Sequence, residues 1–472
     1  MFSDLREYIN QVKEFGELKV IAGADWDLEI GAITDWQTKP NSPLLLFDKV
    51  KDYKAGYRVV VNLAATARRI ALLLGLPETE KPMEFVKAWR DKTKAGFKPV
   101  PPIEVKTGPI KENIHIGDDV NLFEFPAPRW HELDGGRYIG TGNMVIMRDP
   151  DEGWVNLGTY RVQIQDKNTA TIYMADSHHG NIICRKYWNK GLNCPTAISC
   201  GQDPQLWFAS TSQIPWGVSE YDYCGWMRGK PIEVTRGETT DLPIPATAEI
   251  VLEGELVLPE TETRIEGPFG EFTGYYAGGS LPLPALRVKS ILHRNEPILM
   301  GVSPFRIMPL YHFGRMITRS ANLWDQIDGQ VVGVTGAWIE EQAAQDMAVI
   351  AIKQLYTGHA KQAAMAALSL VRCKYVIVVD DDIDPSDISE VLWAMGTRCN
   401  PEDQIDIIRD GPGMRLDPIL SPEKRARGEY SSSTAIIIAC KPYHWIKDFP
   451  PAIIINPEYM KKTKQKWQKL LE

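Results

Sequence analysis

The chain of 472 residues is 44% hydrophobic and 24% charged, and its formal net charge is −8. This length predicts two to four domains, and the composition is that of an ordinary soluble protein. The acidic charge and the lack of a basic stripe argue against a nucleic-acid-binding protein. The sequence has no run of about 18 apolar residues and starts with a charged, helical segment, so we expect neither a transmembrane helix nor a secretory signal.

The seven cysteines are scattered along the chain, and no Cys-x-x-Cys pair occurs. An odd number of scattered cysteines fits reduced thiols and argues against a zinc ribbon or an iron–sulfur site. We therefore expect a cytoplasmic protein.

Residues 1–115 predict a small α/β domain. Apolar residues at helical spacing follow Ser3, which can cap a helix, and Gly75 is well placed to end a second helix. The elements expected in this part are a helix over 3–15, strands over 44–47 and 57–62, and a helix over 65–74.

Residues 116–315 predict a β-rich domain, because short alternating segments are separated by many turns. This pattern suits a split β-barrel of the flavin-reductase type. An insertion over 204–228 carries some helix. The strands expected here cover 143–148, 155–165, 170–175, 246–257 and 285–293.

Residues 316–450 return to an α/β pattern, in which Asp384 and Pro385 are typical of a helix start. Residues 451–472 indicate a Pro-rich arm and a terminal helix, which we expect to support oligomerisation by packing on a neighbouring subunit. The whole chain is thus predicted to be an α+β protein. The elements expected in this part are a strand over 331–338, a helix over 342–367, a strand over 375–380 and a helix over 457–471.

Two glutamates frame a short loop, Glu266-Gly-Pro-Phe-Gly-Glu271. Its Gly and Pro residues exclude a regular helix or strand and hold the two carboxylates in a fixed relation. Two nearby carboxylates do not both ionise easily, so one tends to keep its proton at neutral pH. The pair indicates an acid and a charged partner for an arginine. The alternative is a solvated surface loop.

Further motifs accompany this loop in a specific order. They are Asn156-Leu-Gly-Thr-Tyr-Arg161, His178-His-Gly180, Pro215-Trp-Gly-Val-Ser-Glu220, Val378-Val-Asp-Asp-Asp-Ile-Asp-Pro385 and Thr397-Arg-Cys-Asn-Pro401. With these motifs the chain resembles the UbiD-like decarboxylases, the 3-polyprenyl-4-hydroxybenzoate decarboxylase family, over nearly its whole length. The glutamate loop combined with the Asp-rich strand end is the specific part of this resemblance.

The resemblance implies a reversible, non-oxidative decarboxylase of an aromatic, heteroaromatic or α,β-unsaturated carboxylic acid. It also implies prenylated FMN, Mn²⁺ or Mg²⁺, and K⁺ as cofactors. Loss of CO₂ from an sp² carbon leaves a charge that side chains do not accept, so a cofactor must act as the electron sink. Arg161 would bind the substrate carboxylate and the cofactor and keep Glu266 ionised, and Glu271 would be the general acid.

Asn156, His179 and Glu220 match the positions that hold the divalent ion at the flavin phosphate in this family. An amide oxygen, an imidazole and a carboxylate suit Mn²⁺ or Mg²⁺, although their spacing alone does not make a metal site. His178 is the alternative ligand if the register differs by one. The separation of Asn156 from Arg161 is odd, so on one strand they would face opposite sides unless Gly158 marks a bulge.

Ser210 and Thr211 could offer hydroxyls and backbone amides to a phosphate, or simply form a turn. His312 and Arg315 fall where relatives place substrate-facing residues, with a solvent-facing position as the alternative. The Asp380–Asp384 cluster is expected to be structural, with Arg398 as a partner.

The expected partners are the acid substrate and CO₂, a flavin prenyltransferase that supplies the cofactor, and further copies in a homodimer or homohexamer. Two other functions stay open. The chain could be a subunit of a multi-subunit aryl or aryl-CoA carboxylase, or a flavin reductase-type oxidoreductase. The presence of Arg161, Glu266 and Glu271 argues against a noncatalytic subunit.

Overall fold

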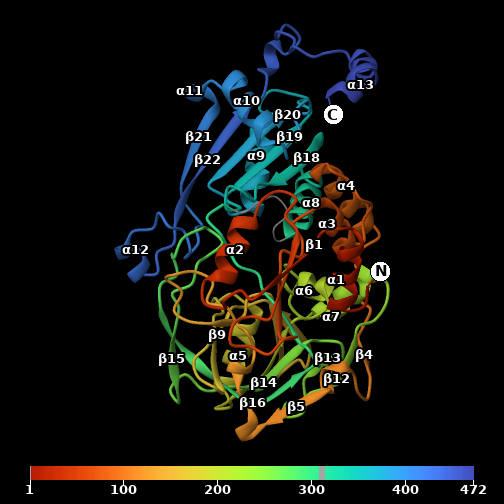
Figure 1. Ribbon diagram of the computed structural model, residues 1–472. Helices are drawn as coiled ribbons and strands as arrows, with labels where there is room; N and C mark the ends of the chain where they lie inside the picture. The colour runs from red at the N-terminus through yellow and green to blue at the C-terminus, as the bar shows by residue number, and fades with distance from the viewer. Residues whose placement is uncertain (1, 308–313, 472) are drawn as a thin grey trace.

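The computed structural model describes residues 2–307 and 314–471. The fold is a mixed α/β fold built around several sheets. Figure 1 shows the C-terminal sheet and its helices at one end and the central sheet at the other, with N-terminal helices between and beside them. Among the described residues, no helix is both long enough and apolar enough to cross a lipid bilayer.

The N-terminal part forms a four-stranded sheet in the order β1-β2-β3-β17. Helix α1 begins after Asp4, whose side chain accepts a hydrogen bond from the Glu7 amide at 2.8 Å, so the predicted cap at Ser3 is wrong by one residue. Helix α3 ends at Gly75 in the left-handed conformation, as predicted. The strands are β1 (Leu18–Ala22), β2 (Leu44–Asp48), β3 (Arg58–Val61) and β17 (Ile298–Met300), and the helices are α1 (Leu5–Glu14), α2 (Glu29–Gln37), α3 (Ala67–Leu74) and α4 (Pro82–Thr93).

The central part is a ten-stranded sheet that curls into a half-barrel, in the order β6-β9-β10-β16-β14-β11-β7-β8. The path ends at β6 and β8, and β5 and β15 both pair with the long strand β16. The strands are β5 (Asn113–Ile116), β6 (Tyr138–Gly140), β7 (Asn143–Arg148), β8 (Val155–Gly158), β9 (Val162–Ile164), β10 (Thr169–Ile172), β11 (Cys194–Cys200), β14 (Ile250–Leu256), β15 (Thr263–Glu266) and β16 (Leu281–His293).

Smaller elements flank this sheet. Helices α5, α6 and α7 all begin or end beside the strand end of β8, and the two in the insertion over 204–228 confirm the helix expected there. The elements are a small sheet of β4 (Ile103–Glu104), β12 (Glu233–Arg236) and β13 (Pro243–Pro245), the helices α5 (His179–Trp188), α6 (Pro204–Ser210) and α7 (Glu220–Arg228), and the 3₁₀ turns η1 (Pro109–Lys111), η2 (Gly117–Asp119) and η3 (Leu122–Glu124).

The C-terminal part holds a five-stranded sheet in the order β18-β19-β20-β22-β21. Its strands are β18 (Val334–Ile339), β19 (Met347–Ile352), β20 (Tyr375–Asp380), β21 (Ile405–Gly411) and β22 (Ser432–Ala439). Its helices are α8 (Arg315–Asp328), α9 (His359–Leu370), α10 (Ile388–Arg398), α11 (Pro401–Gln404), α12 (Pro422–Ala426) and α13 (Pro457–Leu471), with a 3₁₀ turn η4 (Tyr443–Trp445).

Two predictions for this part are wrong. The helix expected over 342–367 is strand β19 followed by helix α9, because residues 348–352 are buried between two neighbouring strands. Such an apolar run fits a buried strand as well as a helix when it is read alone. Helix α10 is capped by Asp387, whose Oδ1 accepts from the Ser389 amide at 2.9 Å, and not by Asp384.

One apolar core connects all three parts of the chain. It includes Leu73 and Trp89 from the N-terminal helices, Leu206 from α6, Trp324 from α8 and Trp338 from β18. Because these side chains pack together, the segments that surround the space between the parts are held in a defined arrangement.

Candidate active site

A cavity of about 630 Å³ lies between the central part of the chain and the C-terminal part. Its volume is in the range of small-molecule sites. The wall is formed by the end of β8, the first turns of α5 and α7, the end of α6 and the chain after β15. The sequence-predicted residues that line it are Asn156, His179, Ser210, Thr211, Glu220, Glu271 and Arg315.

Arg161 binds both of the predicted glutamates beside this cavity. Its Nε and Nη2 donate to the two oxygens of Glu266 at 2.7 and 2.9 Å, and its Nη1 donates to Glu271 Oε1. Glu266 is fully buried at the end of β15, whereas Glu271 lies on the cavity wall. The three residues expected to carry the chemistry are therefore one connected cluster.

The segment Thr159–Arg161 resolves the conflict between Asn156 and Arg161. Strand β8 ends at Gly158 and β9 starts at Val162, so the residues between them do not alternate as a strand. Pairing of β7 with β8 shows no register shift, so Gly158 ends the strand and does not form a bulge. Both predicted side chains can face the same site because the chain turns between them.

Several partners of the cluster were not predicted. The Tyr138 hydroxyl donates to Glu266 Oε1 at 3.1 Å, and the Tyr173 ring lies 4.1 Å from the Arg161 guanidinium. A Cβ atom on Gly278 would lie 3.0 Å from Glu271 Oε1. These residues come from separate strands and turns with no motif of their own, and the sequence carries no signal that would single them out.

Burial and charge determine which group of the cluster holds a proton. Burial raises the pKa of Glu271 above its ordinary value of 4.5, and the charge of Glu266 adds to that rise, while Arg161 opposes it. Burial lowers the pKa of Arg161, but its bond to Glu266 and the charges of both glutamates outweigh burial and raise it. Arg161 therefore stays charged, and within this cluster Glu271 is the carboxyl group that tends to hold a proton.

Glu220 is the first residue of α7 and is 4% exposed. Its Oε2 accepts a hydrogen bond from the Leu157 amide at 2.7 Å, which holds the carboxylate beside Asn156 on β8. Burial raises the pKa of Glu220 to about 8. None of the ion pairs formed by residues 2–307 and 314–471 includes Glu220, so this buried carboxylate fits a site for a cation.

His179 and His178 both line the cavity but have different surroundings. His178 accepts a hydrogen bond from the Ala175 amide at 3.2 Å through Nδ1, and its ring stacks on Tyr160. The His179 ring lies 5.2 Å from Trp216, and burial lowers its pKa. A neutral imidazole is the form that binds a metal, so His179 fits the predicted role. His178 already uses its Nδ1 atom for a hydrogen bond within its own turn.

Ser210 and Thr211 lie at the end of α6. Ser210 Oγ donates to the Trp207 carbonyl at 2.7 Å and lies 2.8 Å from Thr159 Oγ1, and Thr211 Oγ1 donates to the Phe208 carbonyl at 2.8 Å. Both hydroxyls thus bond within the turn, as the alternative interpretation predicts, although both also face the cavity.

The C-terminal part contributes a basic wall. Arg315 lines the cavity, and its Nη2 donates to Gln345 Oε1 at 3.0 Å, as does Arg319 Nη1 at 2.5 Å. Burial lowers the pKa of Arg315 to about 10. Arg372, which no motif marks in the sequence, also lines the cavity. The predicted substrate residue His312 lies outside the described residues.

Family models match three consecutive segments of the chain. Three models of 3-octaprenyl-4-hydroxybenzoate carboxy-lyase match in order: the N-terminal domain over residues 9–89, the Rift-related domain over 103–307 and the C-terminal domain over 312–440. The pyrrole-2-carboxylic acid decarboxylase of Pseudomonas aeruginosa is 34% identical over 93% of this chain and 90% of its own length. The phenolic acid decarboxylase of Bacillus subtilis is 31% identical over 89% of this chain and 90% of its own.

Solved structures show the same fold. The UbiD-class enzyme HmfF from Pelotomaculum thermopropionicum, in complex with FMN, is 30% identical with a TM-score of 0.85 over 97% of this chain and 98% of that one. The vanillic acid decarboxylase of Sedimentibacter hydroxybenzoicus in open form, with a truncated second component, is 29% identical with a TM-score of 0.85 over 100% and 99%. Since family models match nearly the whole chain and its relatives are decarboxylases, the protein belongs to the UbiD family and is a carboxy-lyase.

Proposed function

We propose that this enzyme reversibly decarboxylates an aromatic, heteroaromatic or α,β-unsaturated carboxylic acid without oxidation. The observation that supports this most is the cluster in which Arg161 binds Glu266 and Glu271 while Glu271 faces the cavity. Relatives named for pyrrole-2-carboxylic acid and phenolic acids act on acids of this kind.

The cofactors that we propose are prenylated FMN with Mn²⁺ or Mg²⁺, and K⁺. A relative carries FMN and another form of it carries prFMN. When bound, the flavin supplies the electron sink that an sp² carbon needs when CO₂ leaves. Asn156, His179 and Glu220 would hold the divalent ion, in keeping with the buried carboxylate of Glu220.

The proposed roles within the cluster follow from its bonds. Arg161 binds Glu266 through two hydrogen bonds and holds Glu271 against the cavity, and Glu271 gives the proton that replaces CO₂. The Arg161 side chain is 8% exposed and lies behind Glu271, so it reaches a substrate carboxylate only when Glu271 moves aside.

The substrate end of the site is proposed to include Arg315 and Arg372. Both residues line the cavity from the C-terminal part. Guanidinium groups bind carboxylates and other acidic groups well. Replacing Arg372 with Gln should therefore change the ranking of accepted acids more than the rate with the best acid. An unchanged ranking in an acid panel would remove Arg372 from substrate choice.

The function is tested by expressing the protein with a flavin prenyltransferase, which we propose as the source of the cofactor. The purified protein should show the visible absorption of a modified flavin and release CO₂ from members of an aryl-acid panel. A subunit that acts only in a larger carboxylase would bind no flavin or release no CO₂ alone. A flavin reductase would oxidise a reduced nicotinamide cofactor instead.

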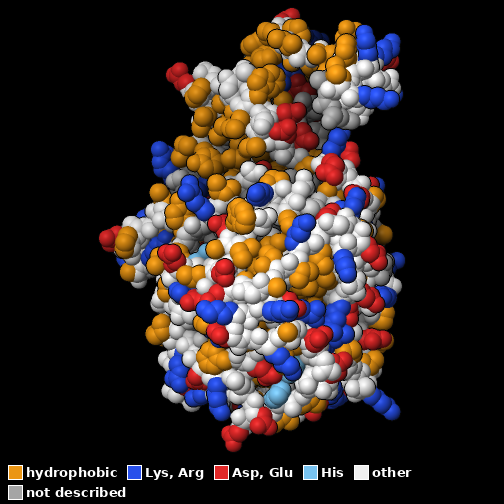
Figure 2. Space-filling view, in the orientation of Figure 1, with side chains coloured by type: hydrophobic (Ala, Val, Ile, Leu, Met, Phe, Trp, Pro, Cys, Tyr) orange, Lys and Arg blue, Asp and Glu red, His pale blue; other side chains and the backbone are white. Residues whose placement is uncertain are grey.

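We also propose that the C-terminal arm packs on a second copy of the chain, in a homodimer or homohexamer. Ile453, Ile454 and Ile455 are 104%, 77% and 56% exposed. Figure 2 shows hydrophobic side chains gathered over the C-terminal end of the molecule. Apolar runs of this kind mark interaction surfaces. Replacing the three isoleucines with serine should lower the mass measured by light scattering, and an unchanged mass would contradict this role.

The cytoplasmic location stays a proposal. All seven cysteines are free, and all but Cys399 are buried. Free thiols are the rule in reducing compartments, which supports the cytoplasm. Fractionation of cells that express the chain would test it.

A further inference from the structure

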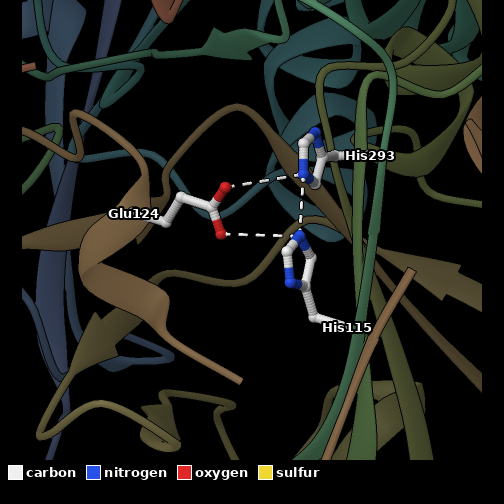
Figure 3. Close-up of side chains that lie close together, drawn as sticks. All are labelled: His115, Glu124 and His293. Carbon is white, nitrogen blue, oxygen red and sulfur yellow. Dashed lines mark hydrogen bonds and ion pairs between the residues drawn. The ribbon is translucent and has the colours of Figure 1, made fainter. Parts of the chain in front are cut away.

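A second group of metal-ligating side chains lies away from the cavity. Among residues 2–307 and 314–471, His115, Glu124 and His293 offer ligand atoms that all lie within 4.8 Å of one another. Figure 3 shows the three side chains pointing toward one centre. None of them lines the proposed flavin cavity.

The sheet brings the two histidines together. Strands β5 and β16 are antiparallel, with His115 opposite Ile291 and Asn113 opposite His293. Residues two apart on a strand share a face, so His115 and His293 are diagonal neighbours on one face of the sheet. Glu124 ends the turn η3, which the buried side chains of Leu122 and Phe125 anchor on either side.

The distances fit the first ligand sphere of a small ion. The two Nε2 atoms are 3.2 Å apart, Glu124 Oε2 lies 3.8 Å from His115 Nε2, and Glu124 Oε1 lies 3.6 Å from His293 Nε2. Four ligands at about 2.0–2.1 Å around Zn²⁺ in a tetrahedron lie roughly 3.3 Å from one another. The carboxylate oxygens are thus about 0.5 Å (3.8 against 3.3 Å) and about 0.3 Å (3.6 against 3.3 Å) farther from the ring nitrogens than in the bound geometry.

The surroundings orient the ligands toward that centre. His293 Nδ1 lies 2.9 Å from the carbonyl oxygen of Arg294, so Nδ1 carries the hydrogen and the lone pair of Nε2 points inward. The Tyr57 hydroxyl donates to Glu124 Oε1 at 3.0 Å. The Phe125 ring packs edge-on against His293, whose side chain is 4% exposed.

A simpler explanation gives one hydrogen bond between the histidines and two longer ion pairs to Glu124. The two imidazoles could share a single proton across their 3.2 Å separation. That bond leaves Glu124 at 3.6 and 3.8 Å from the two ring nitrogens, beyond hydrogen-bond distance. A divalent ion at the centre binds all three groups at once.

We propose that His115, Glu124 and His293 bind one divalent transition-metal ion of the Zn²⁺ type. Two imidazoles and a carboxylate are typical Zn²⁺ ligands, and imidazole favours zinc over magnesium or calcium. A neighbouring surface cavity of about 320 Å³, lined by Tyr57, Phe123 and Glu124, offers water as the fourth ligand. The ion joins β5 and β16 to η3 and, through Tyr57, to the residue before β3.

The test uses the full-length protein after treatment with a chelator, with Co²⁺ as the probe. Wild type should bind one Co²⁺ more per chain than His115→Ala and show the visible band of four-coordinate Co²⁺, which Zn²⁺ then displaces. His115→Ala and Glu124→Gln should both lose this band. His444→Ala removes an exposed histidine elsewhere and should keep it.

A variant with weakened metal binding and a measurement of Tm distinguish metal binding from a purely structural contact. Tyr57→Phe should weaken Co²⁺ binding about 10- to 100-fold, the usual effect of losing a partner that orients a ligand. Zn²⁺ should raise the Tm of wild type and His444→Ala but not that of His115→Ala. Equal Co²⁺ stoichiometry and equal spectra in wild type and His115→Ala, with both proteins folded by circular dichroism, would overturn the proposal.

Discussion

The cavity and the C-terminal sheet each hold an arginine between two carboxylates, yet their charges are balanced differently. In the C-terminal sheet, Arg398 Nη1 donates to Asp380 at 2.8 Å and to Asp382 at 2.7 Å, which confirms the predicted partner. Lys441 adds a second cation at 2.7 Å from Asp382. Partial burial raises the pKa of Asp382, but its bonds to Arg398 and Lys441 lower it to about 2.

In the cavity, the ion pairs among the described residues give Glu266 and Glu271 a single cation, Arg161. The pKa of Glu271 is raised by burial and by Glu266, whereas that of Asp382 is lowered. Depth of burial and the number of cations together, and not the mere presence of an arginine, therefore decide whether a carboxyl group keeps a proton. The cavity cluster is suited to proton transfer and the C-terminal cluster to structure.

The largest effect is expected from Glu271→Gln. Glutamine keeps the size and hydrogen bonds of the side chain but removes the proton, so turnover of the flavin-loaded enzyme should fall roughly 10²- to 10⁴-fold. Flavin content should stay that of wild type. Asp382→Asn, the matched change in the other cluster, should keep the rate, and a near-wild-type rate in Glu271→Gln would exclude Glu271 as the acid.

Arg161→Met should be the most destabilising change, because it leaves Glu266 buried without its cation. Removing one partner of a buried ion pair costs about 3–5 kcal/mol. The double variant with Glu266→Gln should recover part of that loss in urea unfolding. Arg398→Met should cost less, because Lys441 still binds Asp382. An equal or smaller loss for Arg161→Met would contradict the comparison.

The two clusters should give pH slopes of opposite sign. The pKa of Glu271 is raised in the folded state, so its contribution to stability is full below 4.5 and is lost as pH rises through the folded pKa. Glu271→Gln should thus become more stable relative to wild type as pH rises. Unfolding free energies of both proteins across this range give the difference directly, and a flat or falling difference would argue against the raised pKa.

The smallest effect is expected from Asp382→Asn. The folded pKa of Asp382 is about 2, below its ordinary 3.8, so its contribution is present above pH 3.8 and is lost as pH falls toward 2. Its side chain is 39% exposed, and a pair so open to water contributes about 0–1 kcal/mol. The free energy of unfolding of the variant should fall less steeply below pH 3.8 than that of wild type. An equally steep fall would show that Asp382 does not contribute to stability in acid.

The sequence predicted local elements better than distant contacts. Strands over 143–148 and 375–380 match β7 and β20 because their apolar runs are bounded by turns or charges. The pairing of β17 with β3 joins segments more than 230 residues apart, and no local pattern contains it. The domain boundaries predicted at 115, 315 and 450 stay a prediction.

In the site, too, the sequence predicted residues of a local motif but not those that distant segments contribute. Glu266 and Glu271 were predicted because Gly and Pro mark their segment, although Glu266 ends strand β15 instead of lying in the loop. Tyr138, Gly278 and Arg372 were not predicted, because they lie in separate parts of the sequence and reach the site only when the chain folds. The proposed metal site depends on the strand register that brings His115 and His293 together, and the sequence alone does not provide this register.

The central claim is that burial, together with the neighbouring charge of Glu266, keeps a proton on Glu271. Infrared difference spectroscopy measures this directly through the C=O stretch of a protonated carboxyl group. The difference between wild type and Glu271→Gln should show such a band at pH values above 4.5, the ordinary pKa of this group, while Asp382→Asn leaves the wild-type band in place. A band that disappears at or below pH 4.5, or that persists unchanged in Glu271→Gln, would contradict the account.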